Sequence, residues 1–141
     1  MAADPVSDYP LGQKRPDAVS TPSGVPLDDV TVEAMREGRL AWEDLRATPD
    51  TLRLQAEVAE AVERTALADN LRRAAELAAV PSDTILEIYT ALRPHRSSED
   101  ELEAWAARLD EAGAPLSAAF VREAIDVYAR RGLLAGDRDR V

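Results

Sequence analysis

The prolines of this chain gather at its start, and their placement constrains the fold more than any other feature. Five of the nine prolines fall within residues 1–26 of the 141. Proline lacks a backbone donor and restricts the residue before it, so we expect no helix and at best a poor strand there. The segment's six large apolar side chains are Met1, Val6, Tyr9, Leu11, Val19 and Val25. We therefore predict an extended N-terminal arm over residues 1–26 that docks on a partner, the alternative being a mobile tail.

From Leu27 onward the sequence has the composition of helices. Alanine, the strongest helix former, supplies 26 of the 141 residues. No stretch of useful length alternates apolar and polar residues, so we predict no sheet. Alanine buries little surface, and such a chain forms helices more easily than a thick core, which is typical of a subunit. The prediction is an all-α fold: a small helical domain of about five or six helices over residues 27–136, with a frayed tail at 137–141.

Start and stop signals place the individual helices. Thr31 and Gly38 bracket a short helix at Val32–Glu37, and Ala41–Arg46 favours another turn or two. The expected starts of the longer helices are Thr48-Pro49, Pro81, the capping box Ser98-x-x-Glu101 and Pro115, and the expected stops of the last two are Gly113 and Gly132.

Apolar residues spaced three or four apart predict the core faces of these helices. The expected stripes are Leu52, Ala56, Ala59 and Val62; Leu67, Leu71, Ala74 and Ala78, flanked by Leu77; Ile85, Ile88, Tyr89 and Leu92; Leu102, Trp105, Ala106 and Leu109; and Leu116, Phe120, Ala124, Val127 and Tyr128. Among them, Trp105, Leu109, Phe120 and Tyr128 are the strongest candidates for the core.

The charge balance narrows the possible partners. A net charge of −10 repels phosphate backbones and anionic membrane surfaces, so we expect no nucleic-acid and no membrane role. The absence of cysteine excludes disulfides, thiolate metal sites and thiol nucleophiles, which favours a cytoplasmic protein. No apolar run reaches the roughly 18 residues of a membrane span.

A search for chemistry finds structural explanations for each candidate. His95 is the one histidine, and we interpret it as an ordinary loop or interface residue. The acidic clusters match no calcium loop, and helix faces and N-termini use such residues routinely. Trp42 and Trp105 could be ligand platforms, but at helical spacing Trp105 is more often a core or interface residue. We therefore predict no catalytic, cofactor-binding or metal-binding residue in this chain.

Several segments, in a fixed order, resemble the small (gamma) subunit of diol and glycerol dehydratases. The resemblance runs from about Asp8 to Gly136, and the order and spacing of the segments are far more specific than any one of them. The matching segments are Asp8–Leu11, Thr21–Gly24 with Pro26–Asp29, Thr48-Pro49 with Thr51–Glu57, Arg72–Leu77, Ala79–Pro81, Ile85–Tyr89, Ala91–Pro94, Arg96-Ser97 and Ala118–Ala124.

That resemblance implies a complex. In the family a large, a medium and a small subunit assemble, and the heterotrimer doubles into a dimer of heterotrimers. Adenosylcobalamin lies between the large and medium subunits, and a radical reaction in the large subunit converts 1,2-diols or glycerol to aldehydes. The resemblance thus implies that this chain is a non-catalytic subunit of a carbon–oxygen lyase and binds no cofactor itself.

The same resemblance implies roles for the N-terminal arm and for two arginines. Tyr9, Pro10 and Leu11 would anchor the N-terminal arm on the large subunit. Arg93 and Arg96 would donate to carboxylates or carbonyls of a partner, the alternative being solvated surface arginines.

Three departures from the family pattern affect these expectations. His95 stands where many relatives carry Tyr or Phe, which would soften a packing contact, and Trp105 replaces a smaller aliphatic residue. The chain begins close to Asp8–Leu11, without the amphipathic extension that some relatives use for encapsulation in a microcompartment. We expect encapsulation, if any, to depend on another subunit.

Other functional classes fit the residues less well. The main alternative is a free-standing helical adaptor that binds a partner through its arm and apolar faces. A small enzyme using acidic residues and a paralogue kept for assembly or reactivation rank below it.

Overall fold

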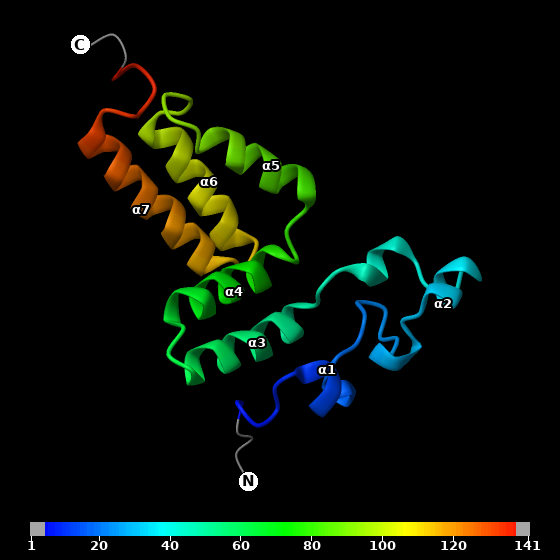
Figure 1. Ribbon diagram of the computed structural model, residues 1–141. Helices are drawn as coiled ribbons and strands as arrows, with labels where there is room; N and C mark the ends of the chain where they lie inside the picture. The colour runs from blue at the N-terminus through cyan, green and yellow to red at the C-terminus, as the bar shows by residue number, and fades with distance from the viewer. Residues whose placement is uncertain (1–4, 138–141) are drawn as a thin grey trace. The chain divides into compact units, whose positions relative to one another are not determined.

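The computed structural model describes residues 5–137, and every regular element in that range is helical (Figure 1). Seven α-helices are accompanied by three short 3-10 helices. The α-helices are α1 (Leu11–Lys14), α2 (Val32–Arg36), α3 (Pro49–Ala61), α4 (Thr65–Leu77), α5 (Ser82–Ala91), α6 (Glu99–Glu111) and α7 (Pro115–Arg131); the 3-10 helices are Pro16–Ala18, Leu27–Asp29 and Trp42–Leu45. The all-α prediction is confirmed. No helix in residues 5–137 is long and apolar enough to cross a bilayer.

The predicted caps lie where the helices begin and end. The Thr48 hydroxyl accepts a hydrogen bond from the backbone N–H of Thr51 at 3.3 Å and caps α3. At α6 the capping box is complete: the Ser98 hydroxyl accepts from the N–H of Glu101 at 3.3 Å, and the Ser98 N–H donates to the Glu101 carboxylate at 2.8 Å. Gly132 ends α7 in the left-handed conformation. Local sequence signals therefore determine where these helices start and stop.

The chain divides into two compact units, unit 1 (Met1–Ala78) and unit 2 (Ala79–Val141). The division falls inside residues 27–136, for which the sequence predicts one helical domain. Within the predicted tail 137–141 the structure describes Asp137, whose carboxylate accepts a hydrogen bond from the Leu134 N–H at 3.0 Å. The remaining tail residues and residues 1–4 of the predicted arm lie outside the described range.

In unit 1, α3 and α4 form a helical hairpin that packs through alanine (Figure 1). Ala56, Ala59 and Ala68 are buried together, and Leu71 packs against them half-buried. Small side chains let the two helix backbones approach closely, so tight packing compensates for the small area that each alanine buries. Three members of the predicted core stripes, Val62, Leu67 and Ala78, are exposed instead, which corrects those three assignments.

The N-terminal stretch of unit 1 contains one turn of α-helix, contrary to the expectation of a wholly non-helical arm. Proline restricts its own backbone and that of the preceding residue. Residues between Pro10 and Pro16 can therefore close one turn, and the Arg15 N–H donates to the Leu11 carbonyl at 2.8 Å. Leu11 itself is buried within unit 1.

Asp44 ties the N-terminal stretch to the following turn. Its carboxylate accepts hydrogen bonds from the backbone N–H of Ala41 at 2.9 Å and of Ser23 at 3.2 Å. Hydrogen bonding from the Ser23 side chain, and next from the Ala41 amide, lowers the pKa of Asp44 below its ordinary value of 3.8. The residue is buried in the structure, so the charged carboxylate is held by these donors.

We expect Asp44→Asn to lower the melting temperature at neutral pH, because the amide nitrogen would face an N–H donor. A depressed pKa contributes stability that is present above 3.8 and is lost as the pH falls through the folded-state value. The difference from wild type should therefore shrink below pH 3.8. Thermal unfolding followed by circular dichroism across this range measures it, with the exposed Asp28→Asn as control. A difference that persists unchanged in acid would contradict the assignment.

In unit 2, α6 packs against α7, and α5 contacts α6 (Figure 1). Leu102 and Val121 are the largest fully buried side chains among the described residues. The remaining fully enclosed residues of α6 and α7 are small: Ala106 and Ala118. The Tyr128 hydroxyl donates to the Leu92 carbonyl, which joins α7 to the end of α5.

The core face of α7 differs from the predicted one. Leu116 and Phe120 are 47% and 48% exposed, and Ser117, Ala118, Val121 and Ile125 are buried in their place. Both sets recur at helical spacing, so periodicity alone does not choose between them. On α6, Leu102, Ala106 and Leu109 are buried as predicted, whereas Trp105 is half-buried.

Candidate partner-binding surface

An apolar surface of α5 is left uncovered in unit 2. Leu86 and Tyr89 are 63% and 64% exposed, while Ile88 on the opposite side of the helix is buried. The sequence pattern places Tyr89 in the core stripe of this helix, and its exposure corrects that assignment. Leu86 is not singled out by the sequence pattern. The sequence feature that could have identified Leu86 is that α5 has more apolar residues than fit on one face of the helix.

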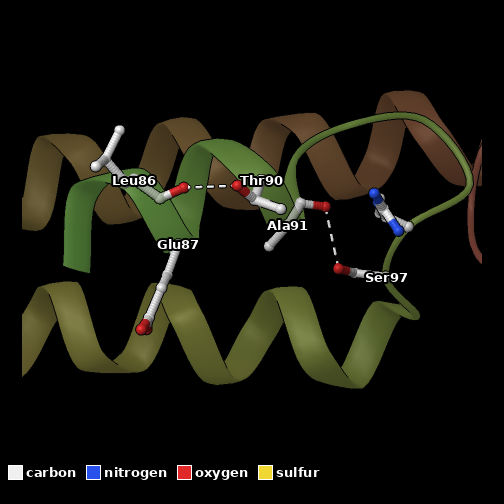
Figure 2. A pocket seen from close by; sticks show the side chains of 6 residues that line it. Leu86, Glu87, Thr90, Ala91 and Ser97 are labelled. Atoms are coloured by element: carbon white, nitrogen blue, oxygen red, sulfur yellow. Dashed lines mark hydrogen bonds between the residues drawn. The ribbon is translucent and has the colours of Figure 1, made fainter. Parts of the chain in front are cut away.

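Figure 2 shows the α5 hollow, an open depression of about 490 Å³ beside this surface. It is lined by Leu86, Glu87, Thr90, Ala91, Arg96 and Ser97. Two hydroxyls in the lining are already engaged as donors. Thr90 Oγ1 donates to the Leu86 carbonyl at 2.9 Å, and Ser97 Oγ donates to the Ala91 carbonyl at 3.0 Å.

The loop between α5 and α6 carries both predicted interface arginines, Arg93 and Arg96. Both are exposed, and neither makes an ion pair with any residue in the described part of the chain. Between them, His95 adopts a left-handed backbone conformation, with φ 60°. Its imidazole Nδ1 is buried and has no hydrogen-bond partner among the described residues.

Backbone bonds hold this loop to the chain that follows α7. The His95 N–H donates to the Leu133 carbonyl at 2.6 Å, and the Ala135 N–H donates to the Ser97 carbonyl at 2.9 Å. The left-handed conformation is uncommon outside glycine, although histidine is one of the residues enriched in it. These bonds fix the positions from which the two arginines extend.

The other three predicted interface residues lie in unit 1. Tyr9 and Pro10 are exposed, whereas Leu11 is packed inside the unit. Tyr9 borders an open groove of about 800 Å³. The groove is lined by Val6, Tyr9, Gln55, Val58, Ala59, Val62, Arg64, Leu67 and Leu71.

Other charged residues have structural partners. Arg122 bridges Glu103 and Asp110, and hydrogen bonds from it to these two carboxylates raise its pKa. Arg72 pairs with Glu60, which is the main cause of its raised pKa, and with Asp69. Within residues 5–137 no group of three or more His, Cys, Asp or Glu side chains is placed to hold a metal ion.

The two tryptophans have different surroundings. The ring of Trp105 is covered by the Arg108 guanidinium, 4.5 Å from the ring centroid, in a cation–π contact. Trp42 is 73% exposed, the highest value among the large apolar residues described.

Comparison with known proteins agrees with the resemblance in the sequence. The dehydratase small subunit family matches residues 5–135. This chain belongs to that family. It is 52% identical over 133 residues to the propanediol dehydratase small subunit of Citrobacter freundii, and 51% identical to the protein of the same name from Salmonella typhimurium LT2. Each alignment covers 94% of this chain and 77% of the relative. Family membership makes the chain a subunit of a dehydratase.

Proposed function

We propose that this chain is the small structural subunit of an adenosylcobalamin-dependent diol or glycerol dehydratase. In this proposal the large subunit carries the radical reaction that turns a 1,2-diol or glycerol into an aldehyde. The observation that carries it is the identity of 52% with a propanediol dehydratase small subunit across 94% of the chain. The partners are a large and a medium subunit, the assembly is a dimer of heterotrimers, and its compartment is the cytoplasm or a microcompartment within it.

In this proposal adenosylcobalamin is held by the large and medium subunits, and this chain binds none of it. Two open depressions in the described residues, of about 490 and 800 Å³, have the size that suits a drug-sized ligand. The one histidine, a common metal donor, has its Nδ1 buried within unit 2 and lies in a loop held by backbone bonds. The role that we propose for this chain is assembly of the complex.

The exposed interface candidates fit that role. Tyr9 and Pro10 would contact a partner, with the buried Leu11 anchoring their segment to unit 1. Arg93 and Arg96 would donate to acceptors of a partner from the loop that follows α5. The high alanine content supports the same view, because a thin core gains from burial in a complex.

Reconstitution tests the proposed function. The large and medium subunits from the same organism are purified together, and aldehyde formation from propane-1,2-diol with added adenosylcobalamin is measured while this chain is titrated in. We expect activity to rise with added chain and to level off at one small subunit per large subunit. Light scattering should then give the mass of a dimer of heterotrimers. Full activity without this chain, or no association with the other two, would overturn the proposal.

A further inference from the structure

The apolar pair on α5 is not needed for the packing of unit 2. The helix is anchored by the buried Ile88, with the half-buried Ile85 and Leu92 on either side of it. Leu86 and Tyr89 remain uncovered, each with more than 60% of its surface exposed. Exposed apolar side chains that gather beside a hollow are typical of surfaces that bind another protein.

Two arginines, Arg93 and Arg96, lie at the end of that surface without an ion pair to any residue in 5–137, on a chain whose net charge is −10. Elsewhere in unit 2, Arg122 pairs with two carboxylates and Arg108 lies over an indole ring. Arg93 and Arg96 have no carboxylate partner in the described chain. A guanidinium is matched best by a carboxylate, which accepts two parallel hydrogen bonds.

The α5 hollow restricts what can bind in it. The hydroxyls of Thr90 and Ser97 already donate to backbone carbonyls, so the Arg96 guanidinium is the charged donor of the lining. Leu86 and Ala91 contribute apolar groups to the lining, and Glu87 contributes a negative charge. A bare anion is disfavoured by Glu87 and gains nothing from the apolar groups. A segment with a carboxylate next to an apolar side chain matches both the Arg96 guanidinium and the apolar groups of the lining.

The loop between α5 and α6 is ordered before any partner binds. Its conformation is held by the bonds from His95 to Leu133 and from Ala135 to Ser97. His95 keeps a left-handed backbone despite its side chain, and such strained positions cluster at functional sites. A site that is already rigid loses less conformational entropy on binding.

We propose that the exposed face of α5, with Leu86, Tyr89, Arg93 and Arg96, docks a segment of a partner dehydratase subunit that presents a carboxylate next to an apolar side chain. The apolar side chain enters the α5 hollow against Leu86, and the carboxylate accepts hydrogen bonds from the loop arginines. This inference rests on the proposed function, because it takes the occupant from the same complex.

Site-specific cross-linking tests the contact in the assembled enzyme. A benzophenone amino acid replaces Tyr89, and in a matched control variant it replaces Val32, which is equally exposed at 63% but lies in unit 1. We expect a cross-link from position 89 to the large or medium subunit in much higher yield than from position 32, because benzophenone reacts with the groups that contact it. The cross-linked peptide should contain Asp or Glu within a few residues of a large apolar side chain.

Charge reversal tests the chemistry. Arg93→Glu with Arg96→Glu should lower retention of this chain by the other subunits about tenfold, which corresponds to about 1.4 kcal/mol. Arg130→Glu reverses an exposed charge at the end of α7 and should change retention less than about twofold. Circular dichroism of each variant checks folding, and the cross-link remains informative if a charge variant does not fold.

The outcomes separate this inference from the proposed function. Wild-type chain that does not associate with the other subunits overturns the proposed function itself. Association of the wild type together with equal retention of the double variant overturns the docking surface alone. A cross-link from position 89 to a second copy of this chain also overturns it, because the occupant would then be another small subunit.

Discussion

Replacing Leu102 by alanine is expected to lower the free energy of unfolding of unit 2 by about 2–5 kcal/mol. Leu102 is 1% exposed and lies in α6, which packs against α7. The other completely buried residues of α6 and α7, Ala106 and Ala118, are too small to fill the space that its side chain would leave. Unit 2 is small, so this loss is a large fraction of its stability.

Tryptophan fluorescence measures this loss in the full chain. Trp105 is half-buried on α6, three residues beyond Leu102, and its ring is covered by Arg108. Trp42 is removed as Trp42→Phe, which is tolerable because that side chain is largely exposed in unit 1. Urea titration of this single-tryptophan protein then reports the unfolding of unit 2, and the midpoint and slope give the free energy.

Leu86→Ala makes the same chemical change on an exposed leucine of the same unit. It should shift the free energy of unfolding by no more than about 0.5 kcal/mol in the isolated chain. Equal effects of the two substitutions would mean that Leu102 is not a core residue. The pair also separates stability from docking, since Leu86→Ala is expected to weaken association with the partner subunits and Leu102→Ala to act through folding.

The helix boundaries could be predicted from the sequence because they are determined locally. Thr48 and Ser98 make their capping bonds to residues three positions ahead, and Gly132 needs only its own backbone freedom. The turn at Leu11–Lys14 escapes prediction, because the density of prolines suggests that helix is excluded throughout residues 1–26. A single helical turn can form wherever two prolines are far enough apart, so the spacing between prolines predicts such a turn better than their number does.

The core faces were harder to predict, because several helices are apolar on two sides. On α7, Leu116 and Phe120 compete with Val121 and Ile125, and the larger side chains proved to be the exposed ones. On α4 the buried residues are Ala68 and Ala75, although Leu67 beside Ala68 is larger. Size predicts burial poorly where helices pack through alanine, since close approach excludes large side chains from the contact.

Only some residues of the surface on α5 could be predicted from the sequence. The resemblance indicates Arg93 and Arg96 as interface residues, and the structure places both in one loop beside the hollow. The bond from His95 to Leu133 joins residues on either side of α6 and α7 in the sequence, and no local pattern predicts it. Leu86 could not be identified from the sequence, because the residues around it on α5 are also apolar. Long-range hydrogen bonds, which sequence periodicity does not predict, thus determine the conformation of the loop in this surface.

Ala68→Leu should destabilise the α3–α4 hairpin by about 1–3 kcal/mol through overpacking. Ala68 is completely buried against Ala56 and Ala59 of α3, where backbones approach closely and the three added carbon atoms have no space. Hydrogen exchange of the amides in residues 49–77, followed by mass spectrometry, measures the local opening. At tenfold per 1.4 kcal/mol, exchange should accelerate about 5- to 150-fold.

Ala66→Leu is the matched control for this substitution. It adds the same atoms to an exposed position of α4, and leucine and alanine differ little in helix propensity, so exchange should stay within about twofold of wild type. Acceleration by both substitutions would indicate that helix α4 itself, and not its alanine contact, limits stability. Faster exchange in Ala68→Leu alone would show that the close contact between α3 and α4 stabilises unit 1. Ala68 takes part in that contact, whereas Ala66 is exposed.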